Sequence, residues 1–278
     1  MLTQRLIVMA AVLAVCAGAG SRAATAQAKL NAQYTAYLAG LPVGKGSWVI
    51  DIDNAHYSAT VSGATTGLVR VFTGGQGTTA AQGSFNGSQP AASTYTATMT
   101  TTHKSDSVQM TVTNGVAKDI QLDPPIDADP ERVPVTDALR QSIVDPMTAS
   151  LVRMPDTGDL LTSEACQRSA SVFDGRLRYD LRLAFKRMEK VKADKGYAGA
   201  AVVCAVYFTP IAGHIPSRAA VKYLTNMRDM EVWLVPIAGT RVLVPFRFQV
   251  PTPIGLAAVE ADQFVSVPRT VTKGVKTQ

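Results

Sequence analysis

The sequence has few of the residues from which common catalytic and metal sites are built. It contains 3 histidines and 3 cysteines in 278 residues, and the histidines lack the close spacing of a ligand pair such as His-x-x-x-His. A Gly-x-Ser-x-Gly motif is absent, and the glycine-rich stretch 74–77 lacks the lysine of a phosphate-binding loop. The sequence therefore predicts no metal and no cofactor. An enzyme would have to use acid and base groups that folding brings together.

Aromatic residues and long apolar runs are also scarce. Phe, Trp and Tyr make up 6% of the chain, and it contains no recognisable nucleic-acid-binding module, so nucleic acid is excluded as an expected partner. After the N-terminal segment, no apolar run approaches the roughly 20 residues that cross a bilayer as a helix. We therefore expect no transmembrane segment once that segment is removed.

Residues 1–28 have the pattern of a cleaved export signal. Arg5 supplies the positive charge, and the apolar run that follows is too short to span a bilayer. Small residues favour cleavage after Ala26 or Ala28. The alternative is a lipoprotein cleaved before Cys16, which the valine preceding this cysteine disfavours. The sequence predicts a periplasmic protein.

Apolar and polar residues alternate through most of the remaining chain. The clearest case runs from Arg176 to about Met188 and predicts a half-buried antiparallel strand. The apolar run from Ala201 to Phe208 predicts a neighbouring central strand, with a turn at residues 194–196. About a dozen such segments predict a mainly β fold whose antiparallel sheets curl into an open barrel or half-barrel.

One main helix and one or two short helices are expected within this β fold. The main helix is predicted from Ala138 to about Val152, where apolar residues recur at helical spacing, although Pro146 must kink or divide it. A short helix is predicted from Ser217 to Asn226.

Residues 29–268 are predicted to form a single β-rich domain. The alternative is two packed subdomains, about 29–125 and 160–268, joined by the helical segment 136–152. The polar residues 269–278 are expected to form a mobile tail.

Cys166 and Cys204 are the two cysteines that remain after signal cleavage. An even number of cysteines in an exported protein favours a disulfide. The alternative is two separate buried thiols.

Charge is distributed unevenly along the chain. Residues 29–165 carry 8 Lys and Arg against 13 Asp and Glu, whereas residues 166–278 carry 17 against 8. The polar face of the clearest predicted strand is basic and contains Arg176, Arg178, Arg182 and Lys186. This face could meet an anionic partner, such as lipid headgroups or an acidic envelope polymer, or it could be an ordinary solvated sheet face.

Several short motifs in the second half of the chain have a familiar order and spacing. They are Phe173-Asp174-Gly175, Arg178-Tyr179-Asp180, Cys204-x-Val206-x-Phe208, Pro210-Ile211-Ala212-Gly213, Val244-Pro245-Phe246 and Thr252-Pro253-Ile254-Gly255. With these motifs the chain resembles an exported proteobacterial family, domain-of-unknown-function family 3108, over most of its length after the signal. The resemblance implies an envelope location and a β-rich fold, and it transfers no catalytic residue.

A curled sheet with an apolar concave face can hold a hydrophobic ligand. The candidate pocket residues are Trp48, Tyr179, Leu181, Leu183, Phe246 and Phe248; the alternative is that they form an ordinary filled core. The leading hypothesis is non-enzymatic binding or scaffolding of a lipid or another hydrophobic or anionic envelope component. The alternatives are an envelope enzyme acting on a lipid or glycan and an assembly factor that docks its basic face. Nothing in the sequence predicts an oligomeric state.

Overall fold

The computed structural model describes residues 27–53, 55–66, 74–87 and 89–268. Nearly all of the predicted export signal and all of the predicted tail 269–278 lie outside the described residues, so both remain predictions.

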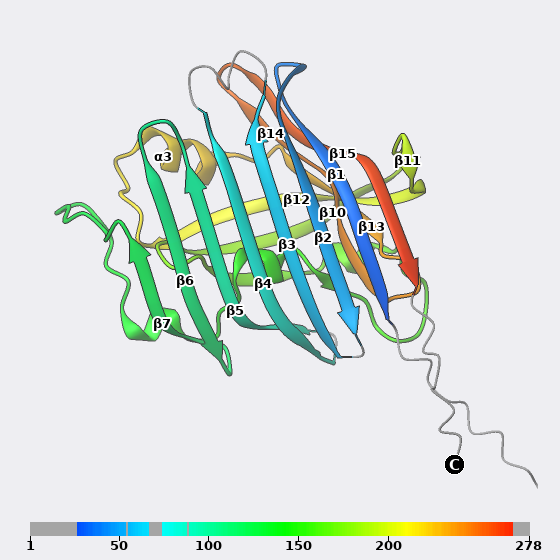
Figure 1. Ribbon diagram of the computed structural model, residues 1–278, viewed down its shortest axis with the longest axis horizontal. Coiled ribbons are helices and arrows are strands. Elements are labelled where there is room, and N and C mark those ends of the chain that lie inside the picture. Colours follow the sequence, from blue (N-terminus) through cyan, green and yellow to red (C-terminus); the bar gives the residue numbers. More distant parts are fainter. Residues whose placement is uncertain (1–26, 54, 67–73, 88, 269–278) are drawn as a thin grey trace, which may run out of the picture.

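The first half of the described chain is an antiparallel meander in which each strand pairs with the next. These strands stand side by side in Figure 1, coloured from blue to green. Their bounds are β1 (Ala28–Leu38), β2 (Leu41–Asp53), β3 (His56–Thr65), β4 (Gln76–Asn86), β5 (Gln89–Thr100), β6 (Ser105–Thr113) and β7 (Val116–Asp123).

The second half adds strands to the other side of β1, because β1 also pairs with the last strand. The bounds are β8 (Val152–Arg153), β9 (Ser169–Phe173), β10 (Arg178–Lys192), β11 (Lys195–Gly196), β12 (Ala198–Ala212), β13 (Met230–Pro236), β14 (Val242–Thr252) and β15 (Gly255–Pro268). All belong to one 15-stranded sheet with the order β7-β6-β5-β4-β3-β2-β1-β15-β14-β13-β12-β10-β9, in which β11 pairs with β15 and β8 with β14.

The sheet curls into a nearly closed barrel. In Figure 1, β10 and β12 cross steeply behind β2 to β6. The gap between the two end strands is bridged by a short segment, in which the Ile143 amide donates to the Gly115 carbonyl and the Val144 amide to the Ser171 carbonyl, both at 2.9 Å. Val144 also forms a parallel bridge with Val172 of β9. The predicted mainly β, open-barrel fold is therefore confirmed.

Strand β12 is buried on both faces, as its continuous apolar run predicts. Ala201 and Val203 belong to the barrel's interior core, which also contains large side chains from β2, β3 and β14. Val202 and Cys204 point the other way, into a second core. The second core lies against α3 (Ala219–Asn226) and the 3₁₀ turn η2 (Ser163–Cys166).

The main helix predicted over 138–152 is wrong. The segment contains the 3₁₀ turn η1 (Asp137–Arg140) and the four-residue helix α2 (Pro146–Ala149), separated by extended backbone. Ser142 has φ = 53°, which interrupts a right-handed helix. Pro146 has no amide hydrogen and occupies the first turn of α2, where none is required. The longest helix is α3, which begins one residue after Arg218 rather than at Ser217.

Replacing Asp145 with alanine is expected to destabilise the protein by about 2 kcal/mol. Asp145 is fully buried and caps α2, accepting from the amides of Met147 and Thr148 at 2.8 and 2.9 Å and from the Thr148 hydroxyl. Its loss leaves the two amides unpaired in the core, whereas the Thr148 hydroxyl keeps its hydrogen bond with the Tyr57 hydroxyl. Urea unfolding measures the effect, and Asp137→Ala at the exposed start of η1 is the control, expected to cost less than about 0.5 kcal/mol. Equal losses in the two variants would contradict this role.

Candidate functional site

A cavity of about 1800 Å³ occupies one end of the barrel. It is lined by the inner face of β1 to β6 and by residues of β14 and β15, and Arg218 at the start of α3 also contributes. Typical small-molecule sites measure roughly 300–1,000 Å³. The cavity is thus large enough for a ligand bigger than a common metabolite.

Three glycines explain why this end of the barrel is hollow. Gly46 of β2 lies opposite Gly63 of β3, and Gly63 lies opposite Gly77 of β4, so the three form one row across the sheet. All three line the cavity. Because a glycine has no side chain, the row leaves the space in front of these strands unfilled.

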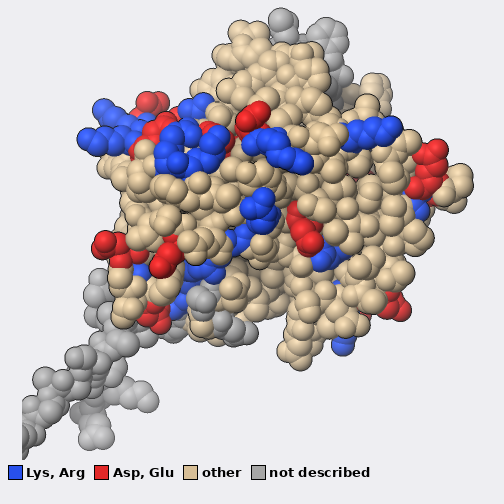
Figure 2. Space-filling model, turned by 180° about the vertical axis from the view of Figure 1, so that it is seen from behind, with Lys and Arg blue, Asp and Glu red and all other residues tan. Residues whose placement is uncertain are grey.

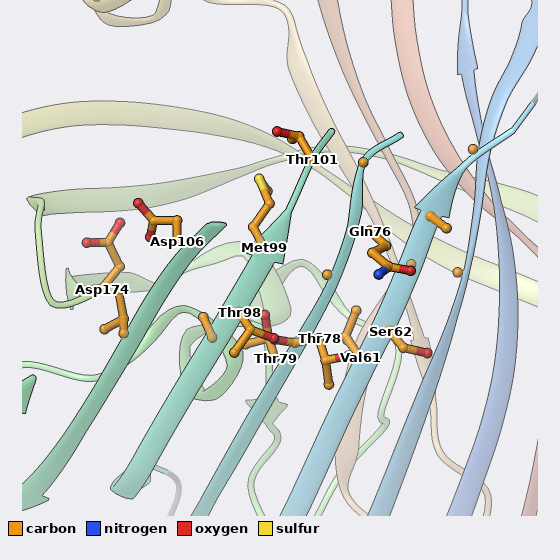
Figure 3. Close-up of a pocket in the computed structure, with 18 of the residues that line it drawn as sticks. Val61, Ser62, Gln76, Thr78, Thr79, Thr98, Met99, Thr101, Asp106 and Asp174 are labelled. Carbon is orange, nitrogen blue, oxygen red and sulfur yellow. The ribbon is translucent and has the colours of Figure 1, made fainter. Parts of the chain in front are cut away.

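The next row of the sheet carries larger side chains and forms the cavity floor. Trp48 lies opposite Val61, Val61 opposite Thr79, and Thr79 opposite Ala97. Figure 3 shows Val61 and Thr79 on the adjacent strands β3 and β4. Beyond this row the inward positions are filled by large side chains such as Ile50 of β2, which is fully buried. Strands β2 and β3 therefore change from glycine to large inward residues along their length, from Gly46 to Ile50 in β2 and from Gly63 to Tyr57 in β3.

The floor also contains a buried hydrogen-bond donor that lacks a partner among the described residues. The Trp48 indole is 6% exposed, and its Nε1 has no hydrogen-bond partner among the described residues. Its ring lies 6.5 Å from that of Tyr34, whose hydroxyl donates to the Pro245 carbonyl at 2.7 Å. Burial raises the pKa of Tyr34, so it remains a neutral phenol. A ligand that reaches the floor therefore meets the aromatic surface of Tyr34 and Trp48, whereas the Trp48 Nε1 itself is buried.

One wall of the cavity is polar. Asp106, Asp174 and Arg176 line it, and Figure 3 shows both carboxylates on the same side. The Arg176 guanidinium lies 3.2 Å from Asp106 Oδ2 and donates to the Pro124 carbonyl at 2.8 Å. Asp174 Oδ1 accepts from the amides of Arg176 and Leu177 at 2.8 and 2.6 Å.

The Asp174 carboxyl is more easily protonated than an ordinary aspartate. Burial raises its pKa, and the two backbone donors and the Arg176 charge only partly oppose this effect. A carboxyl in this state can donate as well as accept a hydrogen bond.

Cations surround the mouth of the cavity. Lys45, Lys104 and Arg218 line it and are exposed. Within the described residues, none of the three has an ion-pair partner. Asp123 and Asp127 lie at the same opening.

The predicted apolar pocket residues are divided between several places. Trp48 lines the cavity, and Phe248 borders it while also packing against the second core. Phe246 is fully buried in the interior core, where it contacts the rings of Tyr197 and Phe264. The others lie away from the cavity: Leu181 and Leu183 pack against the second core, and Tyr179 packs against Phe208. The structure therefore brings two of the six to the cavity.

The four predicted basic-face residues do not form one free cationic surface. Arg176 pairs with Asp106, Arg178 with Asp180 at 2.7 Å, and Lys186 with Glu231 at 2.5 Å. The Arg182 guanidinium lies 4.1 Å from the centre of the Tyr207 ring. A bulge in β10 between Phe185 and Arg187 also breaks the regular alternation. Figure 2 shows Lys and Arg side chains interspersed with Asp and Glu on this side of the molecule.

Glu231 is the centre of the largest of these ion-pair groups. Its side chain is 8% exposed and pairs with Arg187 through two contacts of 3.0 Å and with Lys186. Burial opposes its ionisation, but the hydrogen bonds from Arg187 and Lys186 more than offset this and lower the pKa of Glu231.

Replacing Glu231 with glutamine is expected to cost about 1–2 kcal/mol of unfolding free energy at pH 7. Because the folded pKa is lowered, the contribution is complete above the unfolded value of about 4.3 and is lost as the pH falls through the folded pKa. The difference between variant and wild type should therefore shrink in acid, as measured by urea unfolding at several pH values. Glu189→Gln, which removes the more exposed partner of Arg187, is the control. A difference that is independent of pH would contradict the assignment.

The cavity residues that sequence reasoning missed are the small ones. Gly46, Gly63, Gly77 and Ala97 carry no functional group, and the signal of Gly46 and Gly63 is the change from glycine to large inward residues along β2 and β3. The pairing of Arg176 with Asp106 was also missed, since it joins two distant segments of the chain.

The part of the chain that the structure describes contains no helix with both the length and the apolar character needed to cross a membrane. Within the same residues, no group of three or more His, Cys, Asp or Glu side chains has an arrangement that could hold a metal ion.

Comparisons with known proteins return a family of unknown function. A search of curated proteins finds no match. Among solved structures, the chain is similar to a β-barrel-like protein of domain of unknown function DUF1849 from Brucella abortus, with 8% identity, 87% of this chain and 98% of that chain covered, and a TM-score of 0.44. The model of the family "Protein of unknown function (DUF3108)" matches residues 33–262. Because this match covers most of the sequence, the chain belongs to the DUF3108 family.

Proposed function

We propose that this protein binds a lipid or another elongated hydrophobic molecule of the cell envelope, without transforming it. The observation that carries the proposal is the hollow end of the barrel, where the glycine row Gly46–Gly63–Gly77 leaves a cavity of about 1800 Å³. An ordinary core is packed with few voids larger than a water molecule. A cavity of this size in a protein is therefore a feature that binding explains.

The lining fits an amphiphilic ligand. Val61, Ala97 and Met99 offer apolar surface along the sheet, whereas Asp106, Asp174 and Arg176 gather on one wall. Ligand sites commonly combine an apolar lining with a few convergent polar groups that fix orientation. The apolar part of the ligand would lie along the sheet, and its polar group would meet this wall or the cations at the mouth.

The envelope location rests on two features of the sequence. Residues 1–28 have the pattern of an export signal, and the disulfide between Cys166 and Cys204 suits an oxidising compartment. An envelope protein with a hydrophobic cavity has access to lipids as natural ligands.

Native mass spectrometry of the protein purified from the periplasmic fraction tests the proposal. A lipid adduct is expected, together with the same lipid in an organic extract of the sample. A mass corresponding to the protein alone in repeated preparations, and no binding of added fatty acid or phospholipid, would rule out a lipid carrier.

A second candidate function is an envelope enzyme acting on a lipid or glycan. The observation that favours it is the pair Asp106 and Asp174 beside Arg176, because a carboxyl with a raised pKa in a cavity can act as a general acid. Incubating the protein with envelope lipid or glycan extract separates the two functions. A change in the mass of a component that Asp174→Asn abolishes indicates catalysis, whereas recovery of unchanged ligand supports binding alone.

A further inference from the structure

We propose that the rim of the cavity mouth docks on an anionic phospholipid bilayer, with aliphatic side chains at the hairpin tips inserted among the headgroups. The proposal rests on the proposed function, since docking would bring the opening to the membrane from which a lipid enters or leaves. It differs from the predicted basic face on β10, whose cations are largely occupied by partners within the molecule.

Two neighbouring hairpins carry exposed aliphatic side chains at their tips. Leu41 follows the β1–β2 turn and is 68% exposed, and Ile254 in the β14–β15 turn is 71% exposed. The turns touch, because the Ala39 amide donates to the Leu256 carbonyl at 2.9 Å. Leu256 is also exposed. Leu41, Ile254 and Leu256 thus expose apolar surface together on two touching turns, and grouped exposed apolar side chains, unlike single ones, favour an external apolar partner.

Further apolar side chains lie at the opposite side of the mouth. Met99 near the end of β5 is 62% exposed, and Ile126 follows β7. Both line the cavity. The β1–β2, β5–β6 and β14–β15 turns lie along the same upper edge of the sheet in Figure 1. Exposed apolar groups therefore flank the opening on two sides.

Cations stand among these apolar groups. Lys45, Lys104 and Arg218 are exposed at the mouth, and none has an ion-pair partner among the described residues. Apolar insertion combined with basic side chains is the combination that binds anionic lipid surfaces. These three cations outnumber Asp123 and Asp127 at the same opening, and this excess of positive charge favours anionic phospholipid as the partner.

The shape of the rim favours a bilayer over a protein partner or a second copy of the chain. The exposed apolar side chains form two small sets at the opening, Leu41 with Ile254 on the touching turns and Met99 on the opposite side. Protein interfaces need a contiguous and complementary surface, whereas a fluid bilayer accommodates separate projections.

The test is binding of the purified protein to vesicles, measured by flotation. Vesicles of phosphatidylglycerol and phosphatidylcholine are compared with vesicles of phosphatidylcholine alone. Wild type is expected to bind the anionic vesicles more tightly and to lose affinity as salt is raised. The double variant Leu41→Ser and Ile254→Ser should bind about a hundredfold more weakly, about tenfold for each buried aliphatic side chain that is lost.

A matched control removes two other exposed apolar side chains, which lie elsewhere on the molecule. Val267, 53% exposed near the end of β15, and Met188 on β10 lie away from the mouth. The variant Val267→Ser and Met188→Ser should bind vesicles as wild type does. Docking through the rim is overturned if wild type does not bind, or if the two double variants behave alike. A concentration-dependent dimer that the rim variant abolishes would also overturn it, in favour of self-association.

A measurement without membranes separates docking from ligand binding. A fluorescent fatty acid in buffer reports on the cavity alone, and the rim variant should bind it as wild type does, because Leu41 and Ile254 do not line the cavity. If wild type binds the probe but not the vesicles, docking fails and the proposed function stands. If wild type binds vesicles but takes neither this probe nor any lipid into the cavity, the proposed function fails. Docking of the rim on the bilayer then stands without a lipid-binding role for the cavity.

Discussion

Introducing phenylalanine at both Gly63 and Ala97 is expected to abolish binding of a fluorescent fatty acid while leaving the fold intact. Both residues face the cavity, from β3 and β5 on either side of β4. A β-carbon at Gly63 would lie 3.4 Å from the nearest atom, the Lys45 carbonyl oxygen, so a side chain fits there. Gly46 and Gly77 are unsuitable, because a β-carbon would approach a carbonyl oxygen to 2.8 and 2.9 Å.

The two rings would occupy the middle of the hollow that the glycine row leaves open. Binding by fluorescence titration should weaken by more than tenfold, since the ligand would have to displace packed aromatic side chains. The matched control places phenylalanine at Thr60 and Thr96, which lie on the same strands, are exposed and do not line the cavity. If the variant with phenylalanine at Gly63 and Ala97 binds the fatty acid as wild type does, the ligand binds elsewhere. The same conclusion follows if the Thr60 and Thr96 control loses binding to the same extent.

Removing the disulfide is expected to lower the unfolding free energy by about 4 kcal/mol. Cys166 and Cys204 are bonded, with a sulfur–sulfur distance of 1.98 Å, which confirms the predicted pairing. The bond closes a sequence separation of 38 residues and ties η2 to the central strand β12. Without it the unfolded chain gains the conformational freedom of that loop, which is the main origin of the expected effect in the chain-entropy account.

Guanidinium unfolding of oxidised wild type, reduced wild type and the double variant Cys166→Ala and Cys204→Ala measures this contribution. Both cysteines are fully buried, so the alanine variant also loses packing and should be the least stable. Reduced wild type keeps both side chains and isolates the effect of the bond. If the reduced and oxidised proteins unfold at the same denaturant concentration, the disulfide makes no net contribution.

The strands could be predicted well because alternation and apolar runs depend only on residues that are close together in the sequence. Alternation identified β10, and the continuous apolar run identified β12 as a strand buried on both faces. The cysteine pair was predictable from its even number and the compartment alone. The prediction of the main helix was wrong because it relied on the helical spacing of apolar residues. Pro146 and the positive φ of Ser142 both interrupt a continuous helix in this segment. In that segment the bridge from Val144 to Val172 of β9 takes the place of a helix.

The cavity was not predictable in the same way, because it depends on which residues stand opposite one another. In the sequence, Gly46, Gly63 and Gly77 belong to three separate strands. Only the pairing register shows that they form one row across the sheet. The predicted pocket residues are all large apolar side chains, which are typical of a filled interior. A hollow interior is marked by the absence of side chains at inward positions. Conversely, Leu181 and Leu183 follow the expected alternation but pack against the second core and not in the barrel's interior core.

The pairing of β1 with β15 has a consequence for how the chain folds. The meander of β1 to β7 can form from local hairpins, but its β1 edge stays open until the last strand arrives, with Lys29 opposite Val267. Contacts between distant parts of a sequence form slowly because closing a long loop costs entropy. Closure of the barrel at β1 therefore requires β15, the last strand of the described chain. In a cell that exports this chain from its N-terminus, β1 would cross the membrane before β15. The edge of β1 would then stay unpaired until β15 follows, and such an edge is a binding site for chaperones of the receiving compartment.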